Sequence, residues 1–322
     1  MVEIAGETIE PGEYRRLEIP VARLPTQTQI SIPVRVVNGV SEGARLWISA
    51  AIHGDEINGV EIIRQVVQKI DPQKLQGTLV AVPIVNVFGF IEQSRYLPDR
   101  RDLNRSFPGS ANGSLASRLA HLFMDKIVSC CTHGIDLHTA SDHRVNLPQI
   151  RANLEDEETY RCAKAFGAPI MLHAMTRDGS LRQAATKCGI PILLYEGGEA
   201  LRFEAEAIRV GVEGILRVMD ALGMYRYLEA RQKGTPIVTE QINSLAVTAS
   251  TWVRASCGGI LHLEVGLGQQ VAKKQVLGII SDAFGDTSVK VRATVKGIII
   301  GHTQNPLVNQ GDGIVHLAVL NN

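Results

Sequence analysis

The chain has 322 residues, of which 45% are hydrophobic and 20% are charged, proportions that suit a globular protein with a sizeable core. Lys and Arg together number 33 and Asp and Glu also number 33, so the formal net charge is zero. This balance argues against a nucleic-acid partner and against a polybasic membrane surface, because both need an excess of basic residues, and no apolar run approaches the roughly 18 residues of a membrane-spanning helix.

The first part of the chain predicts strands and then an alternation of strands and helices. Residues 17–37 alternate apolar and polar side chains and end at Asn38-Gly39, a pair typical of a hairpin turn. The apolar run RLWISAAI that follows is typical of a strand buried on both faces. Apolar residues then recur every three or four positions over 56–70, which predicts a helix, and 79–86 is the next buried strand.

The alternation continues through the middle of the chain. The remaining predicted elements are a long polar loop at 89–113, a helix at 115–128, a strand at 134–138, a helix at 155–166, strands at 170–174 and 192–195, and a helix at 203–222. Strands that alternate with helices predict an α/β fold, with a mixed, mostly parallel sheet flanked by helices.

The composition changes near residues 231–236, and no helical period follows. We therefore expect an α/β domain over 1–232, with a β-rich segment to about residue 40, and a small all-β domain over 233–322. Two stretches of the second domain repeat weakly and resemble the barrel-sandwich fold of lipoyl and biotinyl carriers. The turn between them, 281–288, lacks the lysine that carriers modify, so a capping role is the expectation.

The five cysteines give no disulfide framework. Their number is odd, no CxxC pair occurs, and Cys130 and Cys131 are adjacent. The N-terminus is acidic and polar and lacks the basic start and apolar core of a secretory signal. We therefore expect free thiols and a cytoplasmic protein.

Candidate metal ligands lie at the ends of two predicted strands. His53 follows a buried strand and Glu56 lies in the first turn of the next helix, while His138 ends another strand. Nitrogen and oxygen ligands that leave one position open suit a catalytic zinc ion, and open α/β sheets carry their sites at such strand ends. Asp136, on the same side of its strand as His138, is a candidate partner for that ring. A surface histidine beside a helix-capping glutamate is the alternative for the first pair.

An acid and a group of arginines complete the candidate site. Glu196 follows a third apolar strand, where a general base for metal-assisted hydrolysis belongs, and Glu199 is the rival for that role. An ion-paired glutamate at the sheet rim and a solvated arginine loop are the structural alternatives. Asn104 and Arg105 could bind a substrate carboxylate, and another arginine could stabilise an oxyanion. The loop contains four arginines: Arg95, Arg100, Arg101 and Arg105.

In order along the chain, HGDE, DLNRSF, DLHTA and YEGGEA resemble the motifs of the zinc-dependent succinylglutamate desuccinylase/aspartoacylase family. That family is related to the zinc carboxypeptidases and removes acyl groups from N-acylated amino acids. The resemblance covers roughly 40–225 and implies a zinc-carboxypeptidase-like fold for the first domain, which would be catalytic. RYLPDRRDLNRSFPG and YEGGEALRF are nearest to the N-acetyl-diaminobutyrate deacetylase-like branch.

Carried over residue by residue, the resemblance makes Glu196 the catalytic glutamate. It implies that Asn104 and Arg105 bind the substrate carboxylate. The arginine that stabilises the oxyanion precedes this pair; Arg95 fits best and Arg101 is the alternative. The residues implied to bind one Zn²⁺ per chain are His53, Glu56 and His138. Two further candidates for the substrate pocket are His143 and Arg144.

The leading hypothesis is a zinc-dependent amidohydrolase that acts on a small N-acyl amino acid of the acetyl or succinyl type. A metallocarboxypeptidase acting on short peptides would use the same residues and is one alternative. A non-catalytic ligand-binding or carrier module is the other. We expect a small-molecule partner, neither nucleic acid nor membrane, and leave a homo-oligomer open.

Overall fold

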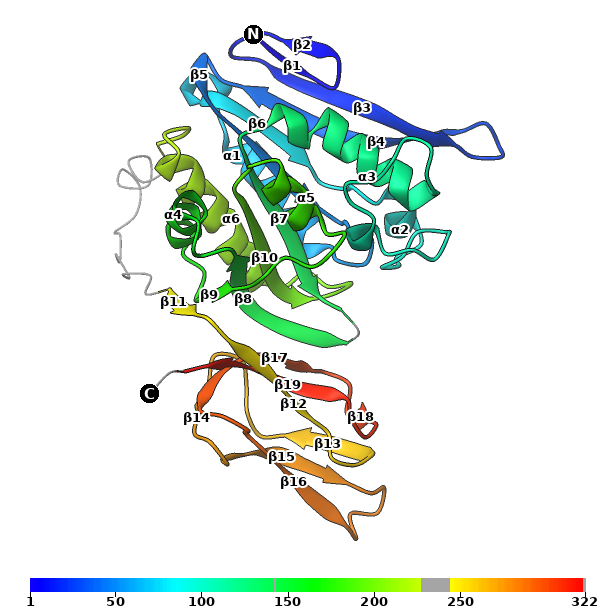
Figure 1. Cartoon of the computed structure of the whole chain (residues 1–322), viewed down its shortest axis with the longest axis vertical. Helices are drawn as coiled ribbons and strands as arrows, with labels where there is room; N and C mark the ends of the chain where they lie inside the picture. The colour runs from blue at the N-terminus through cyan, green and yellow to red at the C-terminus, as the bar shows by residue number, and fades with distance from the viewer. Residues whose placement is uncertain (142, 227–243, 321–322) are drawn as a thin grey trace.

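One mixed sheet of thirteen strands runs through residues 1–141, 143–226 and 244–320, which the computed structural model describes (Figure 1). Ten of its strands form one hydrogen-bonded path: β12 (Ser250–Arg254), β19 (Gly313–Val319), β17 (Gly297–Thr303), β8 (Arg144–Ala152), β10 (Ile192–Glu199), β7 (His133–Ala140), β5 (Ser41–Ala50), β6 (Gln76–Val82), β4 (Gln29–Asn38) and β3 (Tyr14–Arg23). Beside this path, β9 (Ile170–His173) pairs with β8, β11 (Leu245–Val247) pairs with β9, and β14 (Gln270–Val271) pairs with β17. Near the N-terminus, β1 (Val2–Ile4) and β2 (Glu7–Ile9) form a separate pair.

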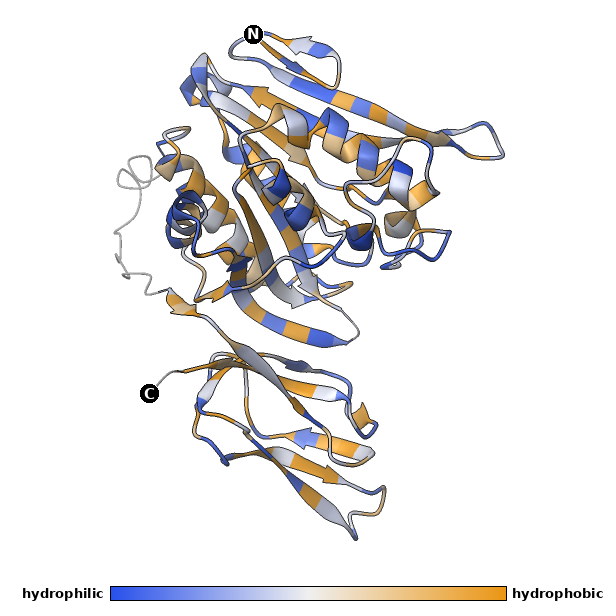
Figure 2. Ribbon diagram, viewed as in Figure 1, coloured by the Kyte–Doolittle hydropathy of each residue, from blue (hydrophilic) through white to orange (hydrophobic). Residues whose placement is uncertain are grey.

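The centre of the sheet is parallel and its margins are antiparallel. Strands β6, β5, β7 and β10 run parallel to one another, and β8 then runs antiparallel to β10. Strands β3 and β4 add antiparallel pairs at the other margin, where Figure 2 shows apolar and polar residues alternating along β3. The predicted α/β arrangement with a mixed sheet is confirmed.

Helices cover both faces of this sheet because its strands turn alternate side chains to opposite sides. In β5, Leu46 and Ile48 belong to one core cluster, and Trp47 between them belongs to the other. The first cluster includes residues of α1 (Asn58–Lys69), α4 (Glu157–Phe166) and α6 (Ala205–Ala221). The second includes residues of α2 (Val87–Ile91), α3 (Leu115–Lys126) and α5 (Leu181–Lys187). Three 3₁₀ turns complete the set: η1 (Pro72–Lys74), η2 (Leu103–Arg105) and η3 (Val128–Cys130).

The C-terminal region consists of strands packed in two layers. A four-stranded sheet of β16 (Ser288–Arg292), β15 (Val276–Ser281), β13 (Gly259–Leu263) and β18 (Leu307–Val308) faces the end of the large sheet. Their shared core includes Leu277 and Ile280 from the small sheet and Ile299 and Leu317 from the large one. No helix occurs within 244–320, so the predicted all-β character is confirmed. The domain boundary expected at 232/233 lies outside the described residues.

The C-terminal strands continue the central sheet. Strand β17 pairs antiparallel with β8, where Gly301 lies opposite Asn146, and β11 pairs parallel with β9. A Cβ on Gly301 would lie 2.7 Å from the Asn146 side-chain oxygen and 3.1 Å from the Val145 carbonyl oxygen, so a larger residue would crowd the junction. This junction places the C-terminal region beside the strand that follows β7.

The hairpin predicted at Asn38-Gly39 is wrong. Strands β4 and β5 do not pair, because β6 lies between them. The connection between β4 and β5 packs instead against the start of β6 and the residue before it. Gly39 N donates to Gly77 O at 2.8 Å, and a Cβ on Gly39 would lie 2.2 Å from the Leu75 carbonyl oxygen. The true hairpin joins β3 to β4 through residues 24–28. Strand β8 and helix α5 were not predicted, and α2 begins before the expected polar loop and extends into it.

All five cysteines lie in the described part of the chain and are free, as expected. Cys131 and Cys162 are buried, whereas Cys188 is exposed. Among the described helices, none has the length and apolar character needed to cross a membrane.

Candidate metal-dependent active site

The register of the parallel strands gathers polar side chains on one face of the sheet. Glu196 of β10 lies directly opposite His138 of β7, and Ser49 of β5 lies opposite Asp136 of β7. Asp136 and His138 are two residues apart and therefore point to the same face. The strand ends thus bring together side chains from three separate motifs.

His53, Glu56 and His138 form a buried cluster. The two oxygens of the Glu56 carboxylate lie 2.8 Å from His53 Nδ1 and 2.7 Å from His138 Nδ1. The three side chains offer one ligand atom each within 4.8 Å of one another, and each residue is 4% exposed or less. The Thr139 backbone N–H donates to the same carboxylate at 3.1 Å.

Each histidine of the cluster has a carboxylate on its other ring nitrogen. His138 Nε2 lies 2.8 Å from Asp136 Oδ2, and Ser49 donates to the other oxygen of Asp136 at 2.8 Å. His53 Nε2 lies 3.2 Å from Asp102 Oδ1. Metal-binding histidines are characteristically oriented in this way, which fixes their tautomer. The donor set fits a zinc ion. Asp136 was expected in this role, and Asp102 was missed because nothing local in the sequence relates it to His53.

Opposing effects set the protonation of this cluster. Burial favours the neutral form of Glu56, but the charges and hydrogen bonds of His53 and His138 outweigh it and hold its pKa well below the usual range. Burial opposes the charged form of His138 as well, yet Asp136 and Glu56 raise its pKa. Glu56 is therefore an ionised carboxylate in this cluster.

The loop that carries His53 and Glu56 packs tightly against α2. Gly54 N donates to Ser94 O at 3.0 Å, and a Cβ at position 54 would lie 1.9 Å from the Gly89 carbonyl carbon. This contact brings Arg95, which follows α2, next to the metal cluster. Arg95 Nη1 lies 3.3 Å from Glu56 Oε1, and its Nη2 lies 3.0 Å from Asp102 Oδ2.

Asn104 and Arg105 reach the same pocket from η2. The Asp102 side chain begins this turn by accepting a hydrogen bond from Asn104 N at 2.8 Å. Asn104 Oδ1 in turn accepts from Leu181 N, at the start of α5, at 2.9 Å. Arg105 Nη1 donates to the Asn104 carbonyl. Both side chains line the cavity that the metal cluster also lines.

The structure does not bring every candidate residue to this cavity. Arg101 is 63% exposed at its side chain and faces Asp99, and it does not line the cavity. Arg100, which has φ of 60°, is also exposed. His143 is exposed in the connection between β7 and β8, whereas Arg144 lines the cavity and lies 5.3 Å over the Trp252 ring.

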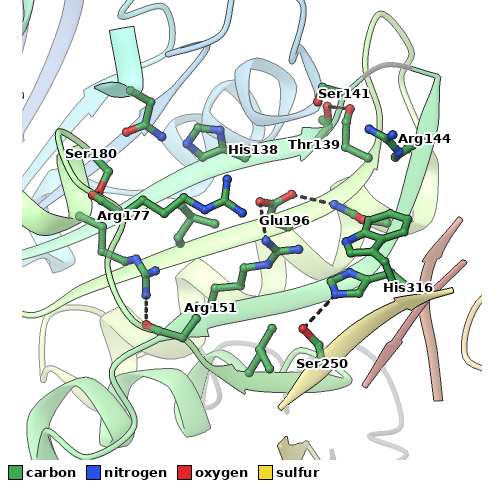
Figure 3. Close-up of a pocket in the computed structure, with 18 of the residues that line it drawn as sticks. His138, Thr139, Ser141, Arg144, Arg151, Arg177, Ser180, Glu196, Ser250 and His316 are labelled. Atoms are coloured by element: carbon green, nitrogen blue, oxygen red, sulfur yellow. Dashed lines mark hydrogen bonds and ion pairs between the residues drawn. The ribbon is translucent and has the colours of Figure 1, made fainter. Parts of the chain in front are cut away.

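Glu196 faces the cavity and Glu199 does not. Asn146 Nδ2 donates to Glu196 Oε2 at 2.7 Å. Arg151 Nη1 lies 3.7 Å from Glu196 Oε1, and Figure 3 shows this arginine reaching toward Glu196. Glu199 lies beyond the irregularity in β10, with its carboxylate 3.6 Å from Arg202 Nε. The geometry therefore separates two glutamates that the sequence left as rivals.

The cavity has a volume of about 820 Å³, and several of the residues that line it were not predicted from the sequence. Arg151 of β8, together with Arg177 and Arg182, lines it. The C-terminal strands add Trp252 and His316, whose rings stack with centroids 4.5 Å apart. The sequence held no signal for most of these residues; the polar positions within 144–152 were the one available hint, once that segment is recognised as a strand.

His316 is buried in this wall and bonded to the neighbouring strand. Its Nε2 lies 2.9 Å from Ser250 Oγ (Figure 3). Burial, reinforced by the charge of Arg151, lowers the pKa of His316 to about 3. The ring is thus neutral at physiological pH and adds a polar but uncharged group to the cavity.

Comparison with known proteins decides the family. The succinylglutamate desuccinylase/aspartoacylase catalytic domain matches residues 42–222, more than half of the chain. The chain belongs to this family. It is 28% identical to an N-alpha-acetyl-L-2,4-diaminobutyric acid deacetylase of Halomonas elongata, over 90% of this chain and 86% of that protein. It is also 30% identical to a succinylglutamate desuccinylase of Pseudomonas aeruginosa, over 41% of this chain and 42% of that protein.

Solved structures of similar proteins show the same fold. A succinylglutamate desuccinylase/aspartoacylase from Rhodobacter sphaeroides superposes with a TM-score of 0.83 at 24% identity, over 99% of both chains. A product-bound ectoine utilization protein from Ruegeria pomeroyi gives 0.82 at 24% identity, over 97% of this chain and 98% of that one. The family resemblance stated from the motifs is confirmed.

The family's catalytic domain, which matches residues 42–222 of this desuccinylase/aspartoacylase family member, does not include every residue that lines the cavity. The metal cluster, Glu196 and all four candidate arginines of the polar loop fall inside 42–222. Trp252 and His316 fall outside it and still line the cavity. The C-terminal strands therefore complete a pocket that the catalytic domain begins.

Proposed function

We propose that this protein is a zinc-dependent hydrolase that cleaves the amide bond of a small N-acyl amino acid. One observation carries the proposal: the buried cluster of His53, Glu56 and His138 lies directly beside Glu196 on one face of the sheet. The names of the relatives, a deacetylase and a desuccinylase of N-acyl amino acids, support the substrate class. We place catalysis in 1–232, with a zinc-carboxypeptidase-like fold, and a capping role in 233–322, with a barrel-sandwich-like fold.

His53, Glu56 and His138 would hold the metal ion. With a metal ion bound in place of their protons, the two imidazoles would be neutral, and with one carboxylate they would leave a coordination position open, which is the composition of catalytic rather than structural zinc sites. When bound, zinc supplies a Lewis acid that polarises a carbonyl and lowers the pKa of water to about 7. The carboxylates of Asp136 and Asp102 keep both imidazole rings oriented for this role.

Glu196 is proposed as the general base and acid. Its carboxylate accepts the proton of the attacking water and then donates it to the nitrogen of the leaving amine. Asn146 donates to one oxygen and so leaves the other facing the cavity. Arg151 Nη1 lies 3.7 Å from that second oxygen.

Arg95 is proposed to stabilise the oxyanion, and Asn104 with Arg105 to hold the substrate α-carboxylate. Arg95 lies against Glu56 and Asp102, so its guanidinium is fixed at the edge of the metal cluster before substrate arrives. Arginine binds carboxylates through two parallel hydrogen bonds, which orients the amide as well as binding it. Arg105 and Asn104 are adjacent on η2 and reach the cavity together.

The carboxypeptidase alternative is less favoured by the shape of the cavity. The strands that carry Trp252 and His316 line one side of the pocket, and we expect this wall to limit the length of peptide that can bind. A small N-acyl amino acid needs less room.

The test is amine release from a panel of N-acyl amino acids and peptides of three or four residues, with and without a chelator. We expect chelator-sensitive release from at least one N-acyl amino acid and little from the peptides. Faster hydrolysis of the peptides would favour the carboxypeptidase, and no release by the zinc-loaded protein from any compound would contradict both.

A further inference from the structure

A second group of metal-ligating side chains lies at the start of β7, away from the catalytic cluster. His133, Glu158 and Cys162 offer one ligand atom each, and these atoms lie within 4.8 Å of one another. His133 is the first residue of β7, and His138 lies five residues further along, about 16 Å at the usual rise of a strand. This odd separation turns the two rings to opposite faces of the sheet, so the two clusters share no ligand.

Helix α4 carries Glu158 and Cys162 on one side, because residues four apart in a helix lie one turn above each other. The Asp156 side chain begins this helix by accepting a hydrogen bond from Thr159 N at 2.8 Å. Cys162 is 3% exposed and belongs to the core cluster between the helix and the sheet. Its Sγ lies 3.9 Å from Glu158 Oε1, and the same oxygen lies 2.9 Å from His133 Nε2. One carboxylate oxygen thus meets both of the other ligands.

The His133 ring is held on its other side by Thr132. Its Nδ1 lies 2.9 Å from Thr132 Oγ1, and that hydroxyl donates to the Arg45 carbonyl at 3.1 Å. Because the hydroxyl proton is used there, Nδ1 donates its own hydrogen to the hydroxyl, and Nε2 of the neutral ring presents a lone pair. This lone pair points at the Glu158 carboxylate, which is ionised at neutral pH. The contact needs a positive charge between the two atoms, either a proton on the ring or a metal ion.

A small cavity borders these side chains. Its volume is about 10 Å³, and His133, Thr159 and Cys162 are among the residues that line it. This is roughly the space of one water-sized sphere, so a single ion fits and an organic ligand does not. The side chains of His133 and Glu158 are 16% and 37% exposed, which leaves the cluster a path to solvent.

We infer that His133, Glu158 and Cys162 form a second metal site, which binds a divalent cation of the zinc type. A thiolate, an imidazole and a carboxylate are all zinc ligands, and the sulfur disfavours magnesium and calcium. The Cys162 thiol gives its proton to solvent when the metal binds, and the two anionic ligands then balance the charge of the ion. The bound ion ties α4 to β7. This site does not depend on the proposed hydrolase function.

Two local features set the affinity of this site below that of the catalytic cluster. Arg161 Nε also binds the Glu158 carboxylate, at 2.8 Å from Oε2, and its positive charge opposes a second cation nearby. Burial raises the pKa of the Cys162 thiol to about 11, so metal binding must displace a firmly held proton. We therefore expect the site to fill only when metal is in excess and to lose its ion on dialysis, which leaves the one ion of the catalytic cluster.

Cobalt(II) distinguishes the two sites, because the catalytic cluster contains no sulfur. A thiolate bound to Co²⁺ gives a near-ultraviolet charge-transfer band that imidazole and carboxylate ligands do not give. Chelator-treated protein titrated with Co²⁺ should develop this band, and Cys162→Ser should lose it. Cys188→Ser is the matched control and should keep the band, since Cys188 is exposed and lies outside the cluster. No band in the wild-type chain at excess Co²⁺, or an unchanged band in Cys162→Ser, would overturn the inference.

His133→Ala tests the imidazole without touching the thiol. Loss of this ligand should raise the Co²⁺ concentration that gives half of the band by at least roughly 10-fold. His262→Ala, at an exposed position of β13, is the control and should leave that concentration unchanged. Equal titrations of His133→Ala and the wild type would remove His133 from the site and contradict the inference.

Thermal stability gives a readout that depends on neither colour nor activity. In His138→Ala, which lacks a proposed catalytic ligand, excess Zn²⁺ should raise the melting temperature through the second site. Adding Cys162→Ser to this variant should make that rise smaller, and a rise of equal size would contradict the inference. Absence of hydrolysis with the cobalt band intact would instead refute the proposed function and leave this second site standing.

Discussion

Two glutamates meet at the cavity, and their partners give them different chemistry. Glu56 has both oxygens engaged by histidine nitrogens at 2.8 and 2.7 Å and is 2% exposed. Glu196 is engaged by one amide, at 2.7 Å, and by an arginine at 3.7 Å. A carboxylate that must bind a metal needs fixed geometry, whereas one that transfers protons needs an oxygen open to the substrate.

This difference predicts that Glu196→Gln separates metal binding from catalysis. The amide keeps the shape of the side chain but cannot accept a proton, so kcat should fall by roughly 10²- to 10⁴-fold. Zinc content, measured by atomic absorption, should stay at one ion per chain. Near-normal turnover would remove Glu196 from the proposed mechanism.

Substitutions in the metal cluster should instead reduce zinc binding itself. His138→Ala removes one of three ligands and should abolish stoichiometric zinc. Asp136→Asn weakens the partner of that histidine and should lower zinc affinity by roughly 10- to 100-fold, measured by competition with a chelator. His262→Ala, at an exposed position of β13, is the control. Unchanged zinc content in His138→Ala would exclude it as a ligand.

At the scale of elements, a glutamate of helix α4 joins that helix to strand β7 of the sheet. Glu158 of α4 lies 2.9 Å from His133 Nε2 of β7 and is hydrogen-bonded to Arg161 within the helix. The hydrogen bonds from Arg161 outweigh partial burial and, together with His133, lower the pKa of Glu158 to about 2. The group is partly exposed, so solvent screens part of this stabilisation.

The sign of this shift gives a pH dependence for stability. A carboxyl whose pKa is lower in the folded state contributes stability above its unfolded pKa of about 4.3 and loses it as pH falls toward 2. Glu158→Gln should therefore be less stable than the wild type at pH 7, with the difference shrinking between about pH 4.3 and 2. Urea midpoints across this range measure it. A difference that stays constant with pH would contradict the assignment.

On the scale of the whole molecule, the C-terminal strands line part of the cavity beside the metal cluster. They extend the central sheet from β8 through β17 and place Trp252 and His316 in the wall. The Trp252 ring stacks on the His316 ring with an interplanar angle of 6°, and the Arg144 guanidinium lies over the Trp252 ring, 5.3 Å from its centroid. The two regions therefore line one cavity although their sequences differ in character.

Trp252→Ala tests this shared pocket. Loss of the stacked contact, worth about 0.5–1.5 kcal/mol, should raise KM by roughly 2- to 12-fold because the wall loosens. Zinc content and the pH dependence of kcat should stay unchanged, since Trp252 does not touch the metal cluster. Steady-state kinetics with the favoured substrate provide the measurement. An unchanged KM would place the C-terminal region outside substrate recognition.

Much of this architecture was predictable because it is encoded locally. Apolar periodicity indicated α1, α3 and α6, a charged segment was predicted as the helix α4, and continuous apolar runs indicated most of the parallel strands. The metal candidates were predictable because His53 and Glu56 are close in sequence and because parallel strands end at one edge of the sheet. Glu196 was predictable for the same reason. These inferences need no knowledge of which segments pack together.

Tertiary structure alone decided the remainder. The pairing of β6 between β4 and β5 overrode a good local turn signal, because the hydrogen bonds that a strand makes depend on distant segments. Long side chains posed the same problem: Arg95 and Arg101 share one loop, but packing of α2 against Gly54 turns the first toward the metal cluster and leaves the second in solvent. The cavity beside the metal cluster is lined from β8, the loop before α5 and the C-terminal strands, which no local pattern relates to one another. The sequence by itself thus determined the chemical groups near the strand ends, and the fold decided which distant side chains surround them.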